Sequence, residues 1–352
     1  MLYSSAPWRL AAGLVWLAAC GGSAAPPSPA PATVPPGAAV STSELRSIVG
    51  VLAADSVEGR RTGTPGSARA ARYLAGLMAS YGLVPAGDSG YFQRVDYEVV
   101  RGAEGEEVRL PGATTADSVI GRINDVNVIG VVHGTDPSLR TEAVVLGAHF
   151  DHLGIGPPVA GDSVYNGADD DASGVAAVLA AARSLALSPP RRSVVVLLTS
   201  GEEQGVLGTQ WYLERPAFPL SHTVADLQVE MVGRPDSLAG GVGRLWLTGY
   251  ERSTMGESFA RAGLDVVPDA RLEFNFFERS DNIVFALKGI PAHTLSSFGM
   301  HGDYHQPSDE VERIDFDHLA RAADVVSRAA RVLADGDAPV WHPGGRPVPA
   351  SP

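Results

Sequence analysis

The sequence contains a single cysteine, Cys20, so no disulfide can form within the chain. It also lacks an excess of basic residues, because 27 lysines and arginines stand against 40 aspartates and glutamates, a formal net charge of −13. That balance argues against a surface for nucleic acid or anionic membranes, which requires clustered positive charge. No Gly-x-Ser-x-Gly motif occurs, which weakens the case for a serine hydrolase. What remains is an ordinary globular composition, 45% hydrophobic and 19% charged.

No apolar run near the amino terminus is long enough to span a bilayer as a helix. Arg9 precedes LAAGLVWLAA (10–19), which has the size of a signal-peptide core. The run ends at Leu17-Ala-Ala-Cys20-Gly, which resembles a bacterial lipobox, in which the cysteine is lipidated and becomes the first mature residue. The alternative is a secretory signal with an incidental cysteine. Both interpretations predict export, and the first predicts a membrane-anchored lipoprotein facing the periplasm or the cell exterior.

The remainder is expected to hold one folded domain. Residues 21–40 are rich in Pro and Ala and show no periodicity, which is typical of an extended tether. No second linker and no internal repeat follows, so a single domain is predicted at 41–336, with a disordered tail at 337–352.

Helical and strand patterns alternate along this domain. Ser41-Thr-Ser-Glu44 is a capping box that predicts a helix through Asp55, and Thr64 opens a second helix that ends near Gly82. Further helices are predicted at 173–187 and 316–335, and buried strands at 127–132, 143–147, 193–199 and just before Met231. This alternation predicts an α/β domain with a mixed, mostly parallel central sheet covered by helices on both faces.

Polar side chains follow the predicted strands. His149 and Asp151 end one strand, Glu202 and Glu203 follow the next, and Glu230 ends a third. Ligands of open α/β sheets bind at such strand ends. With Asp170 and His305, these residues form a set of imidazoles and carboxylates without a thiolate, which suits zinc or a similar divalent metal.

The segment NGADDDASGVA (166–176) places three aspartates side by side. Adjacent carboxylates repel one another unless something neutralises them. Two metal ions about 3.5–4 Å apart need a bridging carboxylate. An aspartate between two dications would therefore account for the acidic triplet.

Six segments occur in the order found in co-catalytic zinc aminopeptidases, metallopeptidase family 28, which the stretch 41–335 resembles. They are Glu58-Gly-Arg60 with Thr62-Gly-Thr-Pro-Gly66, Gly147-Ala-His149-Phe-Asp151-His152, Gly167-Ala-Asp-Asp-Asp-Ala-Ser-Gly174, Gly201-Glu202-Glu203, Glu230-Met-Val-Gly-Arg234 and Asp303-Tyr304-His305-Gln-Pro-Ser-Asp309. The resemblance implies a zinc-exopeptidase fold, peptide substrates and two Zn²⁺ per chain.

The resemblance also implies a role for each matching residue. The metal ligands would be His149, Asp170 as the bridge, Glu203, Glu230 and His305. The catalytic set would be Glu202 as general base, Tyr304 as donor to the oxyanion, and Asp151 as the residue that orients His149. Asp171 would support a turn that contains a non-proline cis peptide, and Asp169 would face solvent or support the site.

The sequence departs from the family at Glu230, where aspartate is usual, and Asp226 is the fallback ligand. His301 remains open between a supporting and a structural role, and His133 and His152 are predicted to be surface or structural residues. Phe274, Phe276 and Phe277 could be core or a hydrophobic wall for substrate.

Three functional alternatives remain. A carboxypeptidase of the same family would need a cationic clamp from Arg234, Arg271 or Arg279. An inactive, zinc-stabilised binding lipoprotein is contradicted by the candidate base Glu202. A glutaminyl cyclase uses a single zinc, whereas both metal sets occur here. We expect an aminopeptidase, because an acidic pocket suits the free α-ammonium group of a peptide.

Overall fold

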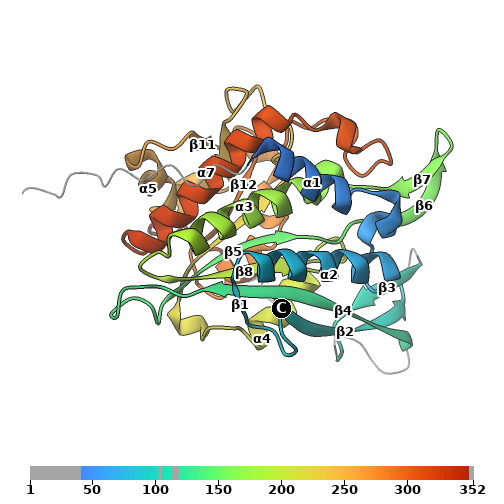
Figure 1. Cartoon of the computed structure of the whole chain (residues 1–352), viewed down its shortest axis with the longest axis horizontal. Coiled ribbons are helices and arrows are strands. Elements are labelled where there is room, and N and C mark those ends of the chain that lie inside the picture. The colour runs from blue at the N-terminus through green and yellow to red at the C-terminus, as the bar shows by residue number, and fades with distance from the viewer. Residues whose placement is uncertain (1–40, 103–104, 113–118, 349–352) are drawn as a thin grey trace, which may run out of the picture. The chain divides into compact units, whose positions relative to one another are not determined.

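The computed structural model describes residues 41–102, 105–112 and 119–348 (Figure 1). The predicted signal peptide, Cys20 and the tether lie outside these ranges. None of the helices within the described ranges is long and apolar enough to cross a membrane.

A ten-stranded mixed sheet forms the centre of the fold. Its strands from one edge to the other are β11 (Val266–Pro268), β10 (Leu245–Leu247), β12 (Ala292–Ser296), β9 (Thr223–Glu230), β5 (Ala143–His149), β8 (Ser193–Thr199), β4 (Val119–Val132), β2 (Phe92–Arg101) and β3 (Glu106–Arg109), and β1 (Val84–Pro85) pairs with β4. The adjacent strands β12, β9, β5 and β8 run parallel, whereas β4, β2 and β3 continue the sheet antiparallel. The hairpin of β6 (Gly154–Val159) and β7 (Asp162–Tyr165) stands apart from it.

In the described part of the chain, seven α-helices pack around this sheet. They are α1 (Thr42–Leu52), α2 (Pro65–Ser80), α3 (Gly174–Leu187), α4 (Leu207–Glu214), α5 (Met255–Arg261), α6 (Asn282–Leu287) and α7 (Phe316–Asp335). The predicted caps are in place, because the side chains of Ser41 and Thr64 accept from the backbone N–H groups of Glu44 and Ser67.

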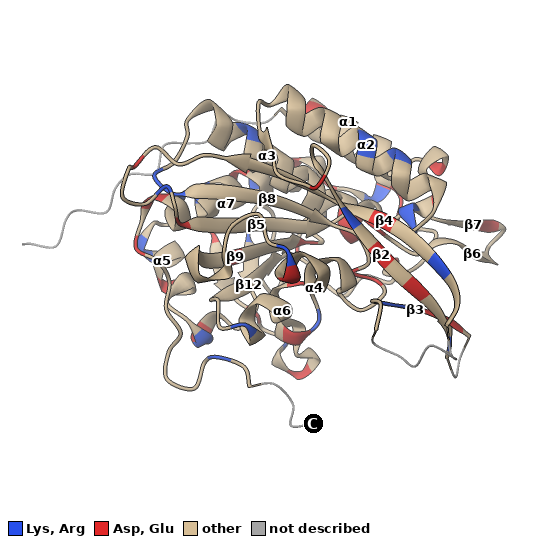
Figure 2. Cartoon of the chain, turned by 90° about the horizontal axis from the view of Figure 1, so that it is seen from below, with Lys and Arg blue, Asp and Glu red and all other residues tan. Residues whose placement is uncertain are grey.

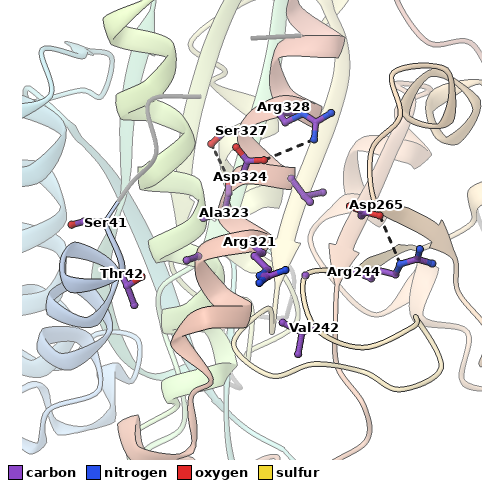
Figure 3. Close-up of a pocket in the computed structure, with 13 residues that line it drawn as sticks. Ser41, Thr42, Val242, Arg244, Asp265, Arg321, Ala323, Asp324, Ser327 and Arg328 are labelled. Carbon is purple, nitrogen blue, oxygen red and sulfur yellow. Dashed lines mark hydrogen bonds and ion pairs between the residues drawn. The ribbon is translucent and has the colours of Figure 1, made fainter. Parts of the chain in front are cut away.

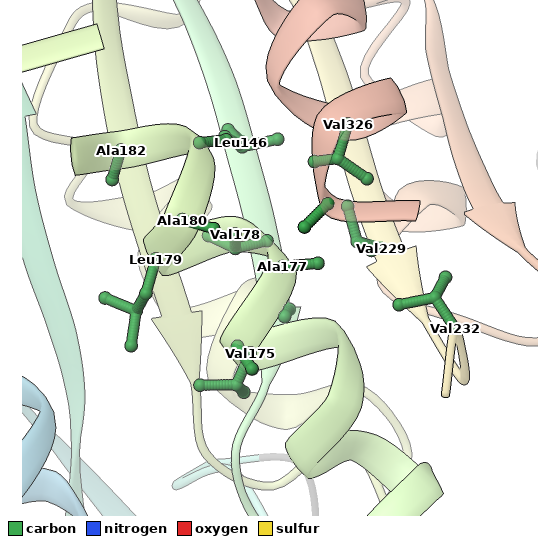
Figure 4. Close-up of a cluster of buried hydrophobic side chains, with 14 of the residues drawn as sticks. Leu146, Val175, Ala177, Val178, Leu179, Ala180, Ala182, Val229, Val232 and Val326 are labelled. Carbon is green, nitrogen blue, oxygen red and sulfur yellow. The ribbon is translucent and has the colours of Figure 1, made fainter. Parts of the chain in front are cut away.

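The core has two halves, one on each face of the sheet. Every residue of β8 is buried, and its side chains alternate between the two faces. Val194, Val196 and Leu198 join the cluster of α1, α2, α3 and α7, while Val195 and Leu197 join α4 and α6. Figure 4 shows the larger half, where α3 and α7 lie side by side over the strands β5 and β9. The predicted α/β fold with helices on both faces is thereby confirmed.

The carboxy-terminal segment differs from the predicted disordered tail. The Trp341 indole N–H donates to the Gly289 carbonyl at 2.9 Å, and Trp341 pairs with Ser253 in an isolated β-bridge. Arg346 donates to the carbonyl of Leu287. The described part of the segment therefore packs on the domain, because one aromatic ring finds a partly buried site there, a contact that a Pro- and Gly-rich sequence does not reveal.

Charges of both signs are distributed over the described elements (Figure 2). Strand β2, for example, carries Arg94 and Asp96, which form an exposed ion pair. The concentration of acidic groups that matters for function lies in the interior, at the carboxyl ends of the central strands.

Candidate active site

The parallel strands β5, β8 and β9 have their carboxyl ends on the same side of the sheet, and the polar side chains lie at or just after these ends. His149 is the last residue of β5 and pairs in register with Thr199, the last residue of β8. Glu202 and Glu203 follow β8, and Glu230 ends β9. Because parallel strands bring their carboxyl ends together, three separate segments meet at this point.

The acidic triplet occupies a short helical turn, Ala168–Ser173, that leads into α3. All three aspartates are buried, and the Asp170–Asp171 peptide bond is cis, as the resemblance implied. Gly167 precedes the turn with φ of +58°. A Cβ at this glycine would collide with the Asp170 carbonyl and the His152 ring, so no other residue fits here without moving the site.

Arg60 fastens this turn to the rest of the fold. Its guanidinium is fully buried and donates to five backbone carbonyls, those of Leu52, Phe150, Asn166, Gly167 and Asp170. One side chain thus ties the end of α1, the end of β5 and the aspartate turn together.

The first candidate metal group contains His149, Asp170 and Glu230, whose ligand atoms lie within 4.8 Å of one another. His149 Nδ1 lies 3.1 Å from the backbone carbonyl of Asp151, which can only accept, so Nδ1 carries the hydrogen. In the neutral imidazole this leaves the lone pair on Nε2, which lies 3.3 Å from Asp170 Oδ1. Among the described residues Nε2 has no hydrogen-bond partner, as expected of a metal ligand.

The second candidate group shares Asp170. Its other oxygen, Oδ2, lies 3.2 Å from His305 Nε2, which in turn lies 3.3 Å from Glu203 Oε2. The ligand atoms of His152, Asp170 and Glu203 lie within 4.8 Å of one another, with His152 Nδ1 2.7 Å from Glu203 Oε1, so His152 is a candidate ligand beside His305. The two carboxylate oxygens of Asp170 therefore face two different imidazoles.

The electrostatics of the cluster fit the binding of dications. Burial raises the pKa of Glu230 to about 7 and that of Asp151 to about 7, and it also raises the pKa of Glu202 well above its usual value. Burial lowers the pKa of His149, but the carboxylates around it, Glu202 first, reverse this and raise it well above 6.5. Burial thus opposes the ionisation of these three carboxyl groups in the absence of a cation. Divalent ions would compensate the negative charge and displace the protons.

The predicted catalytic residues lie next to the metal groups. The Glu202 backbone N–H donates to Asp151 Oδ1 at 3.1 Å, and the Thr62 hydroxyl donates to Asp151 Oδ2. The Asp151 carboxylate lies 3.8 Å from His149 Nδ1, farther than its own backbone carbonyl, so its direct bonds hold the Glu202 loop. Burial and the nearby carboxylates raise the pKa of Tyr304, whose phenol keeps its proton and can donate it in a hydrogen bond.

The other two aspartates brace the turn. Asp171 Oδ1 accepts from the backbone N–H groups of Gly174 and Met231. Asp169 is fully buried, which corrects the expectation that it could face solvent. Its Oδ1 accepts from the Gly233 N–H, and its Oδ2 lies 2.9 Å from His301 Nε2. The open question about His301 is thereby answered in favour of a supporting contact.

Sequence reasoning missed three contributors. His152, predicted as a surface or structural residue, is buried and pairs with Glu203. Asp309 Oδ2 accepts from the backbone N–H groups of both Asp169 and Asp170 at 3.0 Å. Arg60 and Asp309 belong to the quoted motifs, but the sequence predicted no role for them. Their roles follow from contacts with segments that are distant in the sequence.

The aromatic residues divide between the two alternatives. Phe276 lines a cavity beside Glu230 and Tyr304, whereas Phe277 packs in the core with α6. Phe274 is partly exposed and stacks on Phe276 with ring centroids 5.7 Å apart.

A larger cavity of about 570 Å³ lies away from the metal groups, between the start of α1, the helix α7 and the loop 242–244 (Figure 3). Its acids Asp324 and Asp265 are paired with Arg328 and Arg244, and no histidine lines it. Size alone therefore does not mark the reactive site in this fold.

Comparison with known proteins identifies the family. The sequence profile of peptidase family M28 matches residues 127–330, which hold all five predicted metal ligands. The chain belongs to peptidase family M28. This confirms the family and the metallopeptidase class predicted from the six motifs.

Relatives of this M28 protein include a vacuolar membrane protease of Tuber melanosporum, 28% identical over 148 residues, which cover 40% of this chain and 14% of that protein. Among solved structures, the aminopeptidase from Aneurinibacillus sp. strain AM-1 has a TM-score of 0.61 at 18% identity and covers 87% of this chain and 97% of its own. The zinc aminopeptidase BSAP from Bacillus subtilis has a TM-score of 0.60 at 15% identity, covering 84% and 95%. At these identities the structural likeness shows the fold.

Proposed function

We propose that this M28 protein is a zinc-dependent aminopeptidase that removes residues from the free amino terminus of peptides. The observation that carries the proposal is the position of Asp170, whose two oxygens face one imidazole each, at 3.3 and 3.2 Å, in two separate groups of ligands. A carboxylate between two sets of neutral nitrogen and carboxylate donors is the arrangement that a pair of zinc ions requires.

Two zinc ions per chain are proposed, with Asp170 as the shared ligand. His149 and Glu230 would complete one set, and Glu203 and His305 the other. The donor chemistry fits, because the set offers imidazole nitrogens and carboxylate oxygens, and His149 Nε2 lacks another partner among the described residues.

Zinc, when bound, supplies Lewis acidity, which polarises a carbonyl and lowers the pKa of water toward neutrality. Glu202 would accept the proton of the attacking water and deliver it to the departing amine. The raised pKa of this buried carboxylate suits a group that must hold the proton between these events. The Tyr304 phenol would donate to the oxyanion that forms at the scissile carbonyl.

The choice of an aminopeptidase rests on charge. Carboxylates surround the site, and a free α-ammonium group is the end of a peptide that such a site attracts. Two of the structural neighbours are aminopeptidases, which supports this choice.

Replacement of Glu202 tests the mechanism. We expect Glu202→Gln to lower kcat on amino-terminal peptide amides by about 10²–10⁴-fold with zinc content unchanged, because the amide cannot accept the proton. Glu214→Gln at the exposed end of α4 is the matched control and should retain turnover.

Peptides blocked at either end separate the alternatives. Cleavage of amino-acetylated peptides with a free carboxyl end, and not of free-amine amides, would replace the proposal with a carboxypeptidase. Absence of hydrolysis of both sets by the zinc-loaded protein would favour a binding lipoprotein.

Export is also proposed, with residues 1–20 as a lipoprotein signal, 21–40 as a tether, 41–336 as the peptidase domain and a lipid anchor at Cys20. The lipobox-like sequence supports this. Incorporation of a labelled fatty acid that depends on Cys20 would test it, and equal labelling of Cys20→Ser would contradict it.

A further inference from the structure

A small cavity of about 30 Å³, with room for a group the size of a carboxylate, lies directly beside the candidate metal groups. Glu230 and Tyr304 lie on its metal side, and Trp246, Phe276 and Phe298 form aromatic walls that are buried to at least nine-tenths. Because it adjoins the ligand Glu230, a residue next to the bond under attack would place its side chain or its end group in this cavity.

One cation lines the cavity, the guanidinium of Arg279. Of the three arginines that could bind an anionic group, two are already neutralised. Arg234 pairs with Asp303 and Asp309 at 2.6 and 2.9 Å, and Arg271 binds the carboxylate of Asp236 through two hydrogen bonds of 2.6 and 2.8 Å.

Arg279 has no such partner. Among the described residues no carboxylate forms an ion pair with it, and its guanidinium lies over the Phe276 ring, 5.3 Å from the centroid. A guanidinium that stacks on an aromatic face keeps its edge N–H groups free to bind a carboxylate.

The cavity also offers a second donor without an acceptor. The indole N–H of Trp246 is buried and has no hydrogen-bond partner among the described residues. Among the neighbouring hydroxyls, that of Thr294 donates to Asn282 and that of Ser296 donates to the Met231 carbonyl. A wall with an unpaired guanidinium and an unpaired N–H complements a group that only accepts, which a carboxylate is.

We propose that Arg279 is a specificity-determining residue that binds a carboxylate of the peptide substrate in this cavity. The inference rests on the proposed function. Two zinc ions would offset much of the negative charge of Asp170, Glu202, Glu203 and Glu230 and so lessen the repulsion of an acidic group, and Arg279 supplies the opposite charge. The carboxylate comes either from the side chain of an amino-terminal Asp or Glu, or from the α-carboxylate of a carboxy-terminal residue.

The test compares pairs of substrates that differ only in one charge. Wild type should cleave Glu-Ala-Ala amide with a kcat/KM about five- to tenfold above that for Gln-Ala-Ala amide, the range expected of a partly exposed bidentate pair. Arg279→Gln should bring this ratio to about one, and Arg279→Lys should keep part of it. Arg279→Glu should reverse the charge preference, so that Lys-Ala-Ala amide becomes a better substrate than Glu-Ala-Ala amide.

Arg140→Gln is the matched control. Arg140 is exposed and precedes β5, whose opposite end carries His149, so its removal should leave the ratio at the wild-type value. Thermal unfolding of each variant confirms that a changed ratio does not reflect a damaged fold.

A second arm identifies the source of the carboxylate. In this arm tripeptides with a free amino terminus and either a free or an amidated carboxyl end are compared. If wild type prefers the free acid and Arg279→Gln abolishes that preference, the bound group is the α-carboxylate. If Arg279→Gln instead abolishes the preference for Glu over Gln, the bound group is the side chain.

Ratios that are unchanged by Arg279→Gln in both arms, with substantial turnover, overturn the inference and leave the peptidase proposal standing. Failure of zinc-loaded wild type to cleave any of these peptides overturns the peptidase proposal itself, and the inference with it.

Discussion

Glu230 and Asp226 lie on the same strand, β9, four residues apart, but in different surroundings. Glu230 is at the strand end with His149 and Asp170. Asp226 lies deeper in the sheet, fully buried, where Gln228 donates to one of its oxygens and burial raises its pKa well above 3.8. The longer side chain at the strand end is therefore the one within reach of the first metal group.

Zinc content distinguishes the two carboxyl groups. We expect Glu230→Gln to lower the zinc content from two ions per chain to about one, because the first set loses an anionic ligand. Asp226→Asn should keep both ions, since Asp226 is not among the candidate metal ligands and the amide has the same shape. The measurement is metal analysis after gel filtration, and the reverse outcome would assign the ligand role to Asp226.

At the scale of elements, the site depends on connections between segments rather than on any one of them. The aspartate turn is held by Asp309 from the loop after β12 and by Arg60 from the segment after α1. Arg60 itself has φ of +52°, in the left-handed region, so the preceding turn is shaped to direct this side chain inward.

Removal of Arg60 should loosen these connections. We expect Arg60→Met to lower the free energy of unfolding by about 3–5 kcal/mol, because buried carbonyls lose their donors. It should also weaken zinc binding, since the turn that carries Asp170 loses its anchor. Urea unfolding and zinc titration measure the two effects, with the exposed neighbour in Arg61→Met as control. Equal unfolding midpoints for the two variants would contradict the role given to Arg60.

Local sequence signals predicted the central elements well. The helix α7 and the strand β8 have the predicted bounds. An aspartate, Asp315, caps α7, and β8 is a run rich in β-branched residues that begins at Ser193. The strands β10 and β11 were not predicted. Each has three residues, too few for a periodic pattern, and each exists through pairing with distant segments.

The same division applies to the site. The sequence placed His149, Glu202 and Glu230 at the ends of parallel strands, and the structure brings these strand ends together. His152 was assigned no such place, because its contact with Glu203 spans 51 positions and follows no local pattern. Residues that brace a site through backbone contacts carry the weakest sequence signal.

At the scale of the whole described unit, stability depends on pH through a buried imidazole. His293 in β12 lies 2.7 Å from the Thr248 carbonyl through Nδ1 and 2.7 Å from the Ser253 hydroxyl through Nε2. The carbonyl requires the hydrogen on Nδ1, so in the neutral ring Nε2 accepts from the hydroxyl, and a second proton would require the hydroxyl to turn and accept. Burial lowers the pKa of His293 from 6.5 to about 4.

The sign follows from proton counting. Between pH 6.5 and 4 the unfolded chain binds a proton at this residue that the folded chain does not, so stability from His293 is complete above pH 6.5 and declines as pH falls toward 4. The expected loss is about 3 kcal/mol. Urea unfolding should show that the free energy of unfolding falls less between pH 6.5 and 4 in His293→Gln than in wild type, by this amount. Parallel profiles of stability against pH for the two proteins would refute the prediction.

Exposure differs sharply among the candidate metal ligands. The side chains of His149, Asp170 and Glu203 are 2–6% exposed, whereas His305 is 34% exposed and sits on a loop with φ of +57°. If two ions are bound as proposed, a chelator in solution would reach the one beside His305 first. Extraction would then be stepwise, through a species with one ion, and the zinc content of a purified sample would depend on the buffers used to prepare it.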